Sequence, residues 1–410
     1  MPRLNIRNLL FFLAIIGPGI ITANVDNDAG GIATYSLAGA NFGYTLLWVL
    51  IPITIVLVVV QEMCSRMGVA TGKGLADLIR ENFGIKITFY LMISLVIVNI
   101  MNTISEFAGI AAASEIFHIS RYISVPLCAL LVWWIVVKGT YKTVEKIFLF
   151  ACIFYVSYIF SGVMSSPDWK EVAYNSIIPS FQFSSSYFIM IIAMIGTTIA
   201  PWMQFYLQSS IVEKNIKRRD YKYSKLDVIV GCIIAAVVAY FIILSTASTI
   251  FHSNKQIVDA ADAAVALIPL AGKFAGYLFA FGLLNASIFA ASILPLSTAY
   301  SVSEAFGWEN GVNRKFSEAK KFYLLYTAII VIGAAVIMIP NSSLIFLMYI
   351  SQVLNGVLLP VILIIMLRLV NNKEIMGDFA NTKTTNIIAV ASTILLVAVN
   401  IFMIVSLFIK

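Results

Sequence analysis

Long apolar runs recur along the whole chain and are separated by short polar connections. A helix that crosses a bilayer needs roughly 20 apolar residues, and lipid admits only helices or closed barrels because backbone polar groups must be bonded internally. The runs therefore predict an all-α integral membrane protein with eleven transmembrane helices. The expected spans are 8–38, 42–66, 87–117, 122–137, 143–164, 187–212, 228–251, 275–300, 322–338, 343–369 and 386–409.

The composition agrees with a bilayer location and excludes other classes of protein. The chain is 60% hydrophobic and 11% charged, with a mean hydropathy of +0.94, whereas a soluble domain carries about 25% charged residues. Nucleic-acid binding and cytosolic enzymology are therefore excluded. No long linker interrupts the runs, so residues 1–410 are expected to form a single transmembrane domain.

The basic residues predict the orientation of the chain. If Arg3 and Arg7 face the cytoplasm, alternate connections carry most of the Lys and Arg, most densely at 214–225. This asymmetry predicts a multi-pass cell-membrane protein with a cytoplasmic N-terminus and an extracellular C-terminus. Membrane lipid is an expected partner, with anionic lipid at 214–225 an open alternative, and no obligate protein partner is evident. The five of 27 basic residues that fall outside are Arg121, Lys170, Lys255, Lys273 and Lys410.

The first span contains a polar interruption. Gly17-Pro18-Gly19 is followed by Asp26 and Asp28 and then by Gly30-Gly31, after which less polar sequence resumes. Two carboxylates beside paired glycines predict an unwound stretch whose carbonyls and acids face a cation. A polar loop between a short helix and the next span is the alternative.

The sixth span contains a matching interruption. Gly196 and Pro201 flank Thr197 and Thr198, and a proline removes a backbone donor and frees a carbonyl in the preceding turn. A simple proline kink is the alternative. Breaks in spans one and six are the spacing expected for two inverted repeats, spans one to five and six to ten, with a substrate site between them. The expected repeats are about 8–164 and 187–369, followed by an extra span at about 386–409.

Other polar residues lie deep within spans. Glu106 lies inside the third span, where a glutamate must protonate, pair with a cation or line an aqueous path. A protonated glutamate in a structural hydrogen bond is the alternative. In the tenth span, Ser351, Gln352 and Asn355 share a helical face, which suits interhelical hydrogen bonding or a lined pathway.

Several of these segments, in this order, resemble the Nramp family of divalent-metal transporters. The resemblance extends from the first span to just past the tenth. The matching segments are Gly17-Pro18, Asp28-Ala29-Gly30-Gly31, 37–44, 70–77, Pro167-Asp168-Trp169, Ser351-Gln352-Val353 and 375–379.

The resemblance implies a LeuT-like fold with the metal ion held between broken helices one and six. The family motif Asp-Pro-Gly-Asn reads Asp28-Ala29-Gly30-Gly31 here, so the metal-binding aspartate is kept and the asparagine is lost. The family motif Ala-Thr-Val-Met-Pro-His matches Thr197-Thr198-Ile199-Ala200-Pro201-Trp202 in the sixth helix, so Ala200 stands at the position of the family's methionine ligand. The implied metal-binding residues are Asp28, the Thr197 carbonyl and Gln352, with Glu106 and Asp26 contacting the ion's water shell.

These departures favour a hard cation. A methionine sulfur favours softer transition metals, so its loss should relax that preference. Without the asparagine as well, we expect a roomier, oxygen-dominated site that suits Mg²⁺, which sheds its water reluctantly. The resemblance also assigns proton coupling to an acid pair in the third helix and to histidines in the sixth. Here the acid pair reads Thr103 and Glu106, and the histidine positions read Trp202 and, allowing a one-residue insertion, Gln208.

The pattern resembles the Nramp-related magnesium transporter branch. It predicts a secondary transporter for Mg²⁺, and Mn²⁺, that works by alternating access without proton coupling and without a cofactor. A proton-coupled Mn²⁺ or Fe²⁺ symporter that uses Glu106 is the nearest alternative. An amino acid carrier of the same fold is disfavoured by Asp28, and an enzyme by the presence of only two histidines, His118 and His252, in outside connections.

Overall fold

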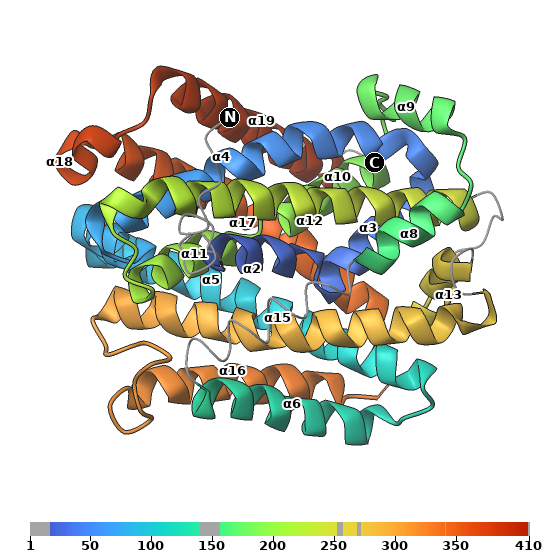
Figure 1. The fold of residues 1–410 in the computed structure, drawn as a ribbon, viewed down its shortest axis with the longest axis horizontal. Coiled ribbons are helices and arrows are strands. Elements are labelled where there is room, and N and C mark those ends of the chain that lie inside the picture. The colour runs from blue at the N-terminus through green and yellow to red at the C-terminus, as the bar shows by residue number, and fades with distance from the viewer. Residues whose placement is uncertain (1–16, 140–155, 252–256, 269–271, 341, 409–410) are drawn as a thin grey trace, which may run out of the picture.

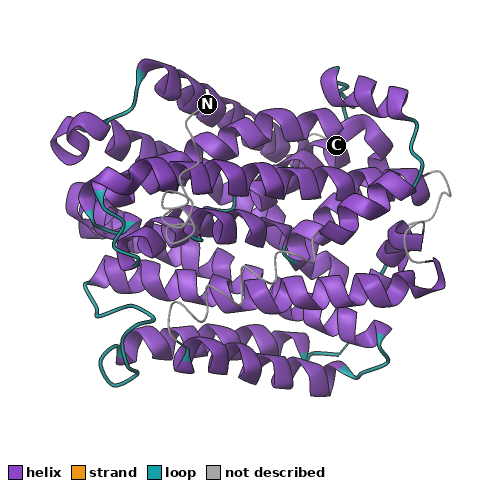
Figure 2. Ribbon diagram, in the orientation of Figure 1, coloured by secondary structure: helices purple, strands orange, loops and turns teal. Residues whose placement is uncertain are grey.

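The computed structural model describes residues 17–139, 156–251, 257–268, 272–340 and 342–408. Every regular element in these ranges is a helix, which confirms the all-α prediction (Figure 2). Nine helical segments of the described residues are long and apolar enough to cross a membrane. One of them, Ala29–Thr71, joins parts of two expected spans, and the expected span 143–164 lies largely outside the described residues. The count of eleven spans therefore stays a prediction.

The first expected span is broken, as predicted. It consists of α2 (Pro18–Asn24), the 3-10 turn η1 (Val25–Asn27) and α3 (Ala29–Phe42). Residues 8–16 of this span lie outside the described residues. Helix α3 runs past the expected end at residue 38, and the turn η2 (Gly43–Leu46) then leads into α4 (Leu47–Thr71). The second span was predicted five residues too early because the apolar sequence continues through this turn.

The third helix begins well before its expected start. Helix α5 (Leu75–Ile116) starts twelve residues ahead of residue 87 and contains a kink at Gly84, whose φ is 78°. The charged residues between 77 and 86 lowered the hydropathy of this first part and hid it from a search for apolar runs. The remaining helices of the first half are α6 (Arg121–Lys138), α8 (Val156–Met164) and the short α9 (Trp169–Ile177).

The second half of the chain contains the second predicted break. Helix α10 (Ser185–Thr198) ends before Pro201, where α11 (Pro201–Glu213) begins. The long helices that follow are α12 (Tyr221–Thr249), α15 (Ala275–Phe306), α16 (Lys320–Ile337), α17 (Leu344–Asn371) and α19 (Lys383–Phe408). The short elements between them are η4 (Arg218–Asp220), α13 (Ala260–Ala264), η6 (Val265–Leu267), η7 (Gly272–Phe274), α18 (Lys373–Met376) and η8 (Gly377–Phe379).

The broken first helix lies in the middle of the bundle. Helix α12 packs on both α2 and α3, while α17 packs on α3 and α5. Helix α15 packs along α5, and α6 and α16 lie against each other at one edge (Figure 1). The two breaks are thereby enclosed by helices from both halves of the chain, which can bond their exposed backbone polar groups.

One acidic side chain holds the start of α2. The Asp227 carboxylate of α12 accepts hydrogen bonds from the backbone N–H groups of Gly17, Gly19 and Ile20, at 3.2, 2.7 and 3.3 Å. These are amides that a helix N-terminus leaves without partners, and a negative charge is favourable there. The two helices approach each other closely at Gly19, which has no Cβ atom. A Cβ atom there would lie only 2.6 Å from the Val228 nitrogen. Asp227 therefore fixes α2 against α12.

This contact lies at the end of the bundle that carries the connections 72–74, 214–220 and 307–319, on the left in Figure 1. We call it the basic end, because these connections contain many of the Lys and Arg residues. Two further contacts close it. Gln208 of α11 donates to the Lys73 carbonyl at 2.9 Å, and Ser209 donates to Glu304 of α15 at 2.5 Å.

Replacing Asp227 by Ala should loosen α2. The change leaves buried amides without an acceptor, at a cost of about 1–3 kcal/mol for each such donor. Cys232 is fully buried on α12, close to both Asp227 and Asp26, so it reports on this region. We expect Asp227→Ala to increase the rate at which a thiol reagent modifies Cys232, measured in a variant that keeps Cys232 as its one cysteine.

Asp220→Ala is the matched control, because Asp220 precedes α12 and pairs with Arg219 at 3.6 Å. In the Asp220→Ala variant, Cys232 should be modified at the same rate as in the parent protein. An unchanged rate in Asp227→Ala would show that Asp227 does not hold α2 in place.

Candidate metal site

Two carboxylates meet at the start of α3. Asp28 is the N-cap of this helix, and its Oδ1 accepts from the Gly31 N–H at 2.7 Å. Glu106 of α5 accepts from the Ala29 N–H at 3.2 Å through Oε2. Asp28 is also close enough to Glu106 for the two charges to interact. The first amides of α3 therefore orient both acids predicted from the sequence.

The break between α10 and α11 lies against the first break. The Thr197 hydroxyl donates to the Asp26 carbonyl at 3.3 Å, and Tyr35 of α3 shares a 2.8 Å hydrogen bond with the Thr198 hydroxyl. Pro201 has no N–H, so the Thr197 carbonyl four residues earlier lacks its helical donor. Thr197, whose carbonyl is the predicted oxygen donor of the sixth span, thus lies beside the unwound part of the first through its hydroxyl.

The fifth predicted residue, Gln352 of α17, reaches the same place. Its side chain packs directly on Gly30, where an added Cβ atom would overlap the Gln352 amide. Its Nε2 donates to Ser351 Oγ at 3.2 Å, and its Oε1 accepts from Asn355 Nδ2 at 2.8 Å. Gln352 therefore turns its nitrogen toward the break and its oxygen away from it.

The site is acidic and buried. Asp26, Asp28 and Glu106 are only 2%, 4% and 0% exposed, and none of them forms an ion pair with a described residue. Both Asp26 oxygens and Glu106 Oε1 lack a hydrogen-bond donor among the described residues. Burying a carboxylate without a partner is costly, so these groups need a cation, a proton or water.

The three acids do not converge on one point. No three His, Cys, Asp or Glu side chains form a metal-binding group in the described part of the chain. Asp28 and Glu106 lie together, and Asp26 is near Asp28, Tyr35 and Cys232 without completing a group of three acids. A cation bound beside Asp28 would take its other ligands from carbonyls, amides, hydroxyls or water.

The expectation of a roomier site is wrong. The sequence suggested that losing an asparagine at Gly31 leaves free space, but a Cβ atom there would overlap the Asp26 carbonyl and lie 3.0 Å from Thr197 Oγ1. The backbone of the unwound segment has closed onto Gly31. The loss of the asparagine is thus matched by closer packing of oxygen-bearing groups.

The residues at the family's proton-coupling positions have structural partners. The Thr103 hydroxyl donates to the Asn99 carbonyl at 2.8 Å, and the Gln208 amide donates to the Lys73 carbonyl at the basic end. Trp202 is buried, and its carbonyl accepts from Ser297 at 3.1 Å. None of these three side chains titrates near neutral pH.

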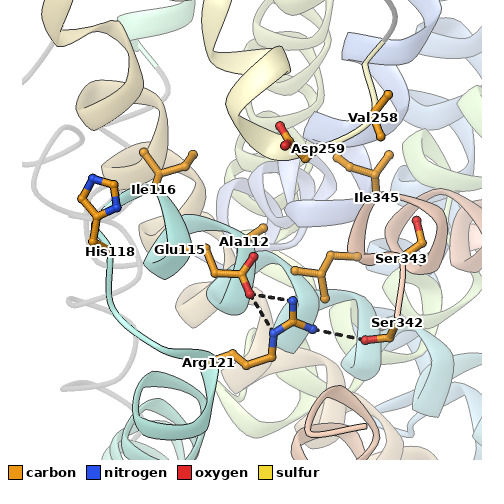
Figure 3. A pocket seen from close by; sticks show the side chains of 11 residues that line it. Ala112, Glu115, Ile116, His118, Arg121, Val258, Asp259, Ser342, Ser343 and Ile345 are labelled. Carbon is orange, nitrogen blue, oxygen red and sulfur yellow. Dashed lines mark hydrogen bonds and ion pairs between the residues drawn. The ribbon is translucent and has the colours of Figure 1, made fainter. Parts of the chain in front are cut away.

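A vestibule opens at the end opposite to the basic end. It has a volume of about 590 Å³, and Arg121 lies across it, paired with Glu115 at 2.6 Å and donating to Ser342 at 3.3 Å (Figure 3). Ile345 borders the vestibule and also a cavity of about 10 Å³ whose wall includes Ala29. The smaller cavity has room for roughly one water molecule. Ile345 thus lies between the vestibule and a small cavity that borders the start of α3.

Several residues around the site were missed or undervalued in the sequence. Tyr35 and Asn102 carry no local signal, since each looks like one polar residue in an apolar helix. Asp227 stood at the edge of an expected span and looked like a solvated end. Asn355 was noted only as part of a polar face. Spacing cannot show their roles, because each partner lies on another helix.

Gly31→Ala tests the close packing of the break. The added methyl group must displace the Asp26 carbonyl, and such overpacking costs about 1–3 kcal/mol. We expect a lower midpoint of thermal unfolding in detergent and weaker binding of Mn²⁺.

Gly276→Ala on α15 is the control, since the nearest neighbour of its Cβ atom would be Ile116 at an ordinary 3.7 Å. It should leave both quantities unchanged. A Gly31→Ala protein as stable as the parent would mean that the break is less tightly packed than described.

Solved structures similar to this chain confirm the predicted fold. A manganese transporter of Eremococcus coleocola superposes with a TM-score of 0.80 at 22% identity, covering 98% of this chain and 88% of that one. MhsT in complex with L-phenylalanine superposes with a TM-score of 0.63 at 14% identity, covering 97% and 98% of the two chains. The fold is therefore LeuT-like, with the first and sixth helices broken.

Sequence relatives cover nearly the whole chain. The divalent metal cation transporter MntH of Yersinia pestis is 26% identical over 408 residues, 96% of this chain and 95% of its own. MntH of Caldanaerobacter subterraneus is 28% identical over 392 residues, 92% and 90% of the two chains. The model of the natural resistance-associated macrophage protein-like family, Nramp, matches residues 19–406. The chain therefore belongs to the Nramp family.

Proposed function

We propose that this protein carries divalent metal ions, Mg²⁺ and also Mn²⁺, across the cell membrane by alternating access and without proton coupling. The observation that carries the proposal is the set of buried carboxylates at the first break, Asp26, Asp28 and Glu106, which have no basic partner among the described residues. The relatives are named as divalent metal cation transporters, and the similar structures described above include a manganese transporter. The family also confirms that the protein is not an enzyme.

The donor atoms at the breaks favour a hard ion. Asp28, Glu106 and the Thr197 carbonyl all offer oxygen, and Ala200 at the start of α11 brings no sulfur. Mg²⁺ prefers oxygen ligands and keeps several of its own waters. Two adjacent carboxylates with other oxygen-bearing groups packed around them suit such an ion.

The shape of the molecule supports one step of the transport cycle. The vestibule approaches the breaks from one end, while Asp227, Gln208 and Glu304 hold the basic end closed. With the basic end cytoplasmic, as the distribution of Lys and Arg indicates, this is an outward-facing arrangement. Release to the cytoplasm would require α2 and α11 to move away from α12 and α15. An inside-negative potential favours entry of a dication by about 4.6 kcal/mol per 100 mV, twice the single-charge value.

A proton-coupled Mn²⁺ or Fe²⁺ symporter is the second candidate. Glu106 favours it, because this acid lies beside Asp28 and one of its oxygens has no donor among the described residues. The absence of a titratable group at Thr103, Trp202 and Gln208 favours uncoupled transport. The two candidates differ in what accompanies the metal ion.

Ion uptake into proteoliposomes that contain an internal pH dye tests the proposal. We expect Mg²⁺ and Mn²⁺ to enter without acidification of the interior, and we expect Asp28→Ala to abolish uptake because it removes the central carboxylate. Glu106→Gln should weaken uptake by disturbing the ion's water shell, with the internal pH still constant. Mn²⁺ uptake with acidification that Glu106→Gln abolishes, and no Mg²⁺ flux, would establish the symporter instead.

Ala200→Met tests the origin of the ion preference. A thioether at the break should favour softer ions, so the ratio of Cd²⁺ to Mg²⁺ affinity should rise by roughly tenfold, which one added contact of about 1.4 kcal/mol provides. The measurement is competition between the two ions in the uptake assay. Ile199→Met places the same thioether one residue away and should leave the ratio unchanged; an equal change in both variants would contradict the assignment of Ala200.

A further inference from the structure

Three buried amides form a continuous line from α5 through α17 to the first break. Asn102 and Asn355 bond each other reciprocally, with both N–H···O distances at 2.9 Å. Asn355 Nδ2 also donates to Gln352 Oε1 at 2.8 Å, and Gln352 lies against Gly30. Each of the three side chains is 1% exposed, so water does not compete for these hydrogen bonds. We call these three side chains the amide relay.

The direction of the amide relay conflicts with cation binding. Gln352 turns Nε2 toward Gly30 and Ser351, and an amide nitrogen is a donor that cannot bind a metal ion. Its oxygen, the atom that a cation requires, is bonded to Asn355. Gln352 can offer that oxygen to the break only if its amide turns over.

The three amides can turn over only together. If Gln352 alone reversed, its nitrogen would face the nitrogen of Asn355, and two donors would meet in a buried place. If Asn355 reversed as well, it would oppose Asn102 in the same way. When all three reverse, the reciprocal pair re-forms, and Gln352 donates to the Asn355 oxygen. Every hydrogen bond among the three amides is then kept, while the bond from Gln352 Nε2 to Ser351 Oγ is given up.

We propose that Asn102 and Asn355 are positioning residues for the metal ion, and that its binding reverses the three amides in concert so that Gln352 presents Oε1 to the break. This inference rests on the proposed function, since it requires a cation at the break. Asn102 acts through Asn355 and Gln352, and it couples α5 and α17 to the filling of the site. The Ser351 hydroxyl, which accepts from Gln352 and donates to the Met348 carbonyl at 2.8 Å, would then donate to the newly placed oxygen instead.

A double replacement separates positioning from stability. A single change such as Asn102→Leu leaves the Asn355 Oδ1 atom without its donor, whereas Asn102→Leu with Asn355→Leu removes both members of the reciprocal pair and leaves Gln352 Oε1 as the one atom that loses its donor. We expect the double variant to unfold at a temperature no lower than that of Asn102→Leu alone. Its affinity for Mg²⁺ and for Mn²⁺, measured by calorimetry in detergent, should fall about tenfold, as when an outer partner of a metal ligand is lost.

Two comparisons make the test specific. Asn99→Leu is the matched control, because Asn99 is buried on the same helix but bonds Thr298 of α15 at 2.9 Å, and it should keep the parent affinity. Gln352→Ala should weaken binding in the parent but have no further effect in the double variant, because the pair acts through Gln352. A purely structural role predicts instead that the double variant recovers both stability and affinity.

The outcomes distinguish the amide relay from the proposed function. Parent protein that binds the ions, together with a double variant of unchanged affinity, would overturn the relay alone. The relay would also be overturned if Gln352→Ala kept its full effect in the double variant. Parent protein that binds neither Mg²⁺ nor Mn²⁺ would overturn the proposed function and the relay with it.

Discussion

The structure depends on three carboxylates that lie deep among apolar helices without a basic partner in the described residues. Such groups would destabilise an ordinary helix bundle, because lipid and apolar side chains cannot solvate a charge. Here the start of α3 provides backbone N–H groups to Asp28 and Glu106, which an unbroken helix could not do. The break in the first helix is therefore both the source of the site and the means of tolerating its charge.

A broken helix in a membrane needs neighbours that bond its exposed backbone. The Thr197 hydroxyl bonds the unwound segment, and Asn27 donates from that segment to the Ala235 carbonyl of α12 at 3.2 Å. Gly30 and Gly31 allow Gln352 and the Asp26 carbonyl to come this close. Since Thr197, Ala235 and Gln352 come from the second half of the chain, the geometry of the break depends on how the two halves pack together.

The breaks and their acids were predictable because their signals are local: Gly, Pro and Asp interrupt an otherwise apolar run. The match to the Nramp family and the LeuT-like fold was predictable for the same reason, from short motifs in order. The crowding at Gly31 was not, because it depends on how the chain folds back on itself. Asn102 and Asp227 were missed because their partners lie on helices far away in sequence, and the Leu75 start of α5 because its charges resemble a loop.

The contact between Asp227 and the start of α2 joins residues 207 to 210 positions apart. Helix α2 has only seven residues, too few to be stable by itself. During synthesis, the N–H groups at the start of α2 cannot bond the Asp227 carboxylate until residue 227 has left the ribosome. Helix α2 therefore cannot reach its final place before α12 has been made, and a truncated chain that ends before α12 would leave the start of α2 without its acceptor.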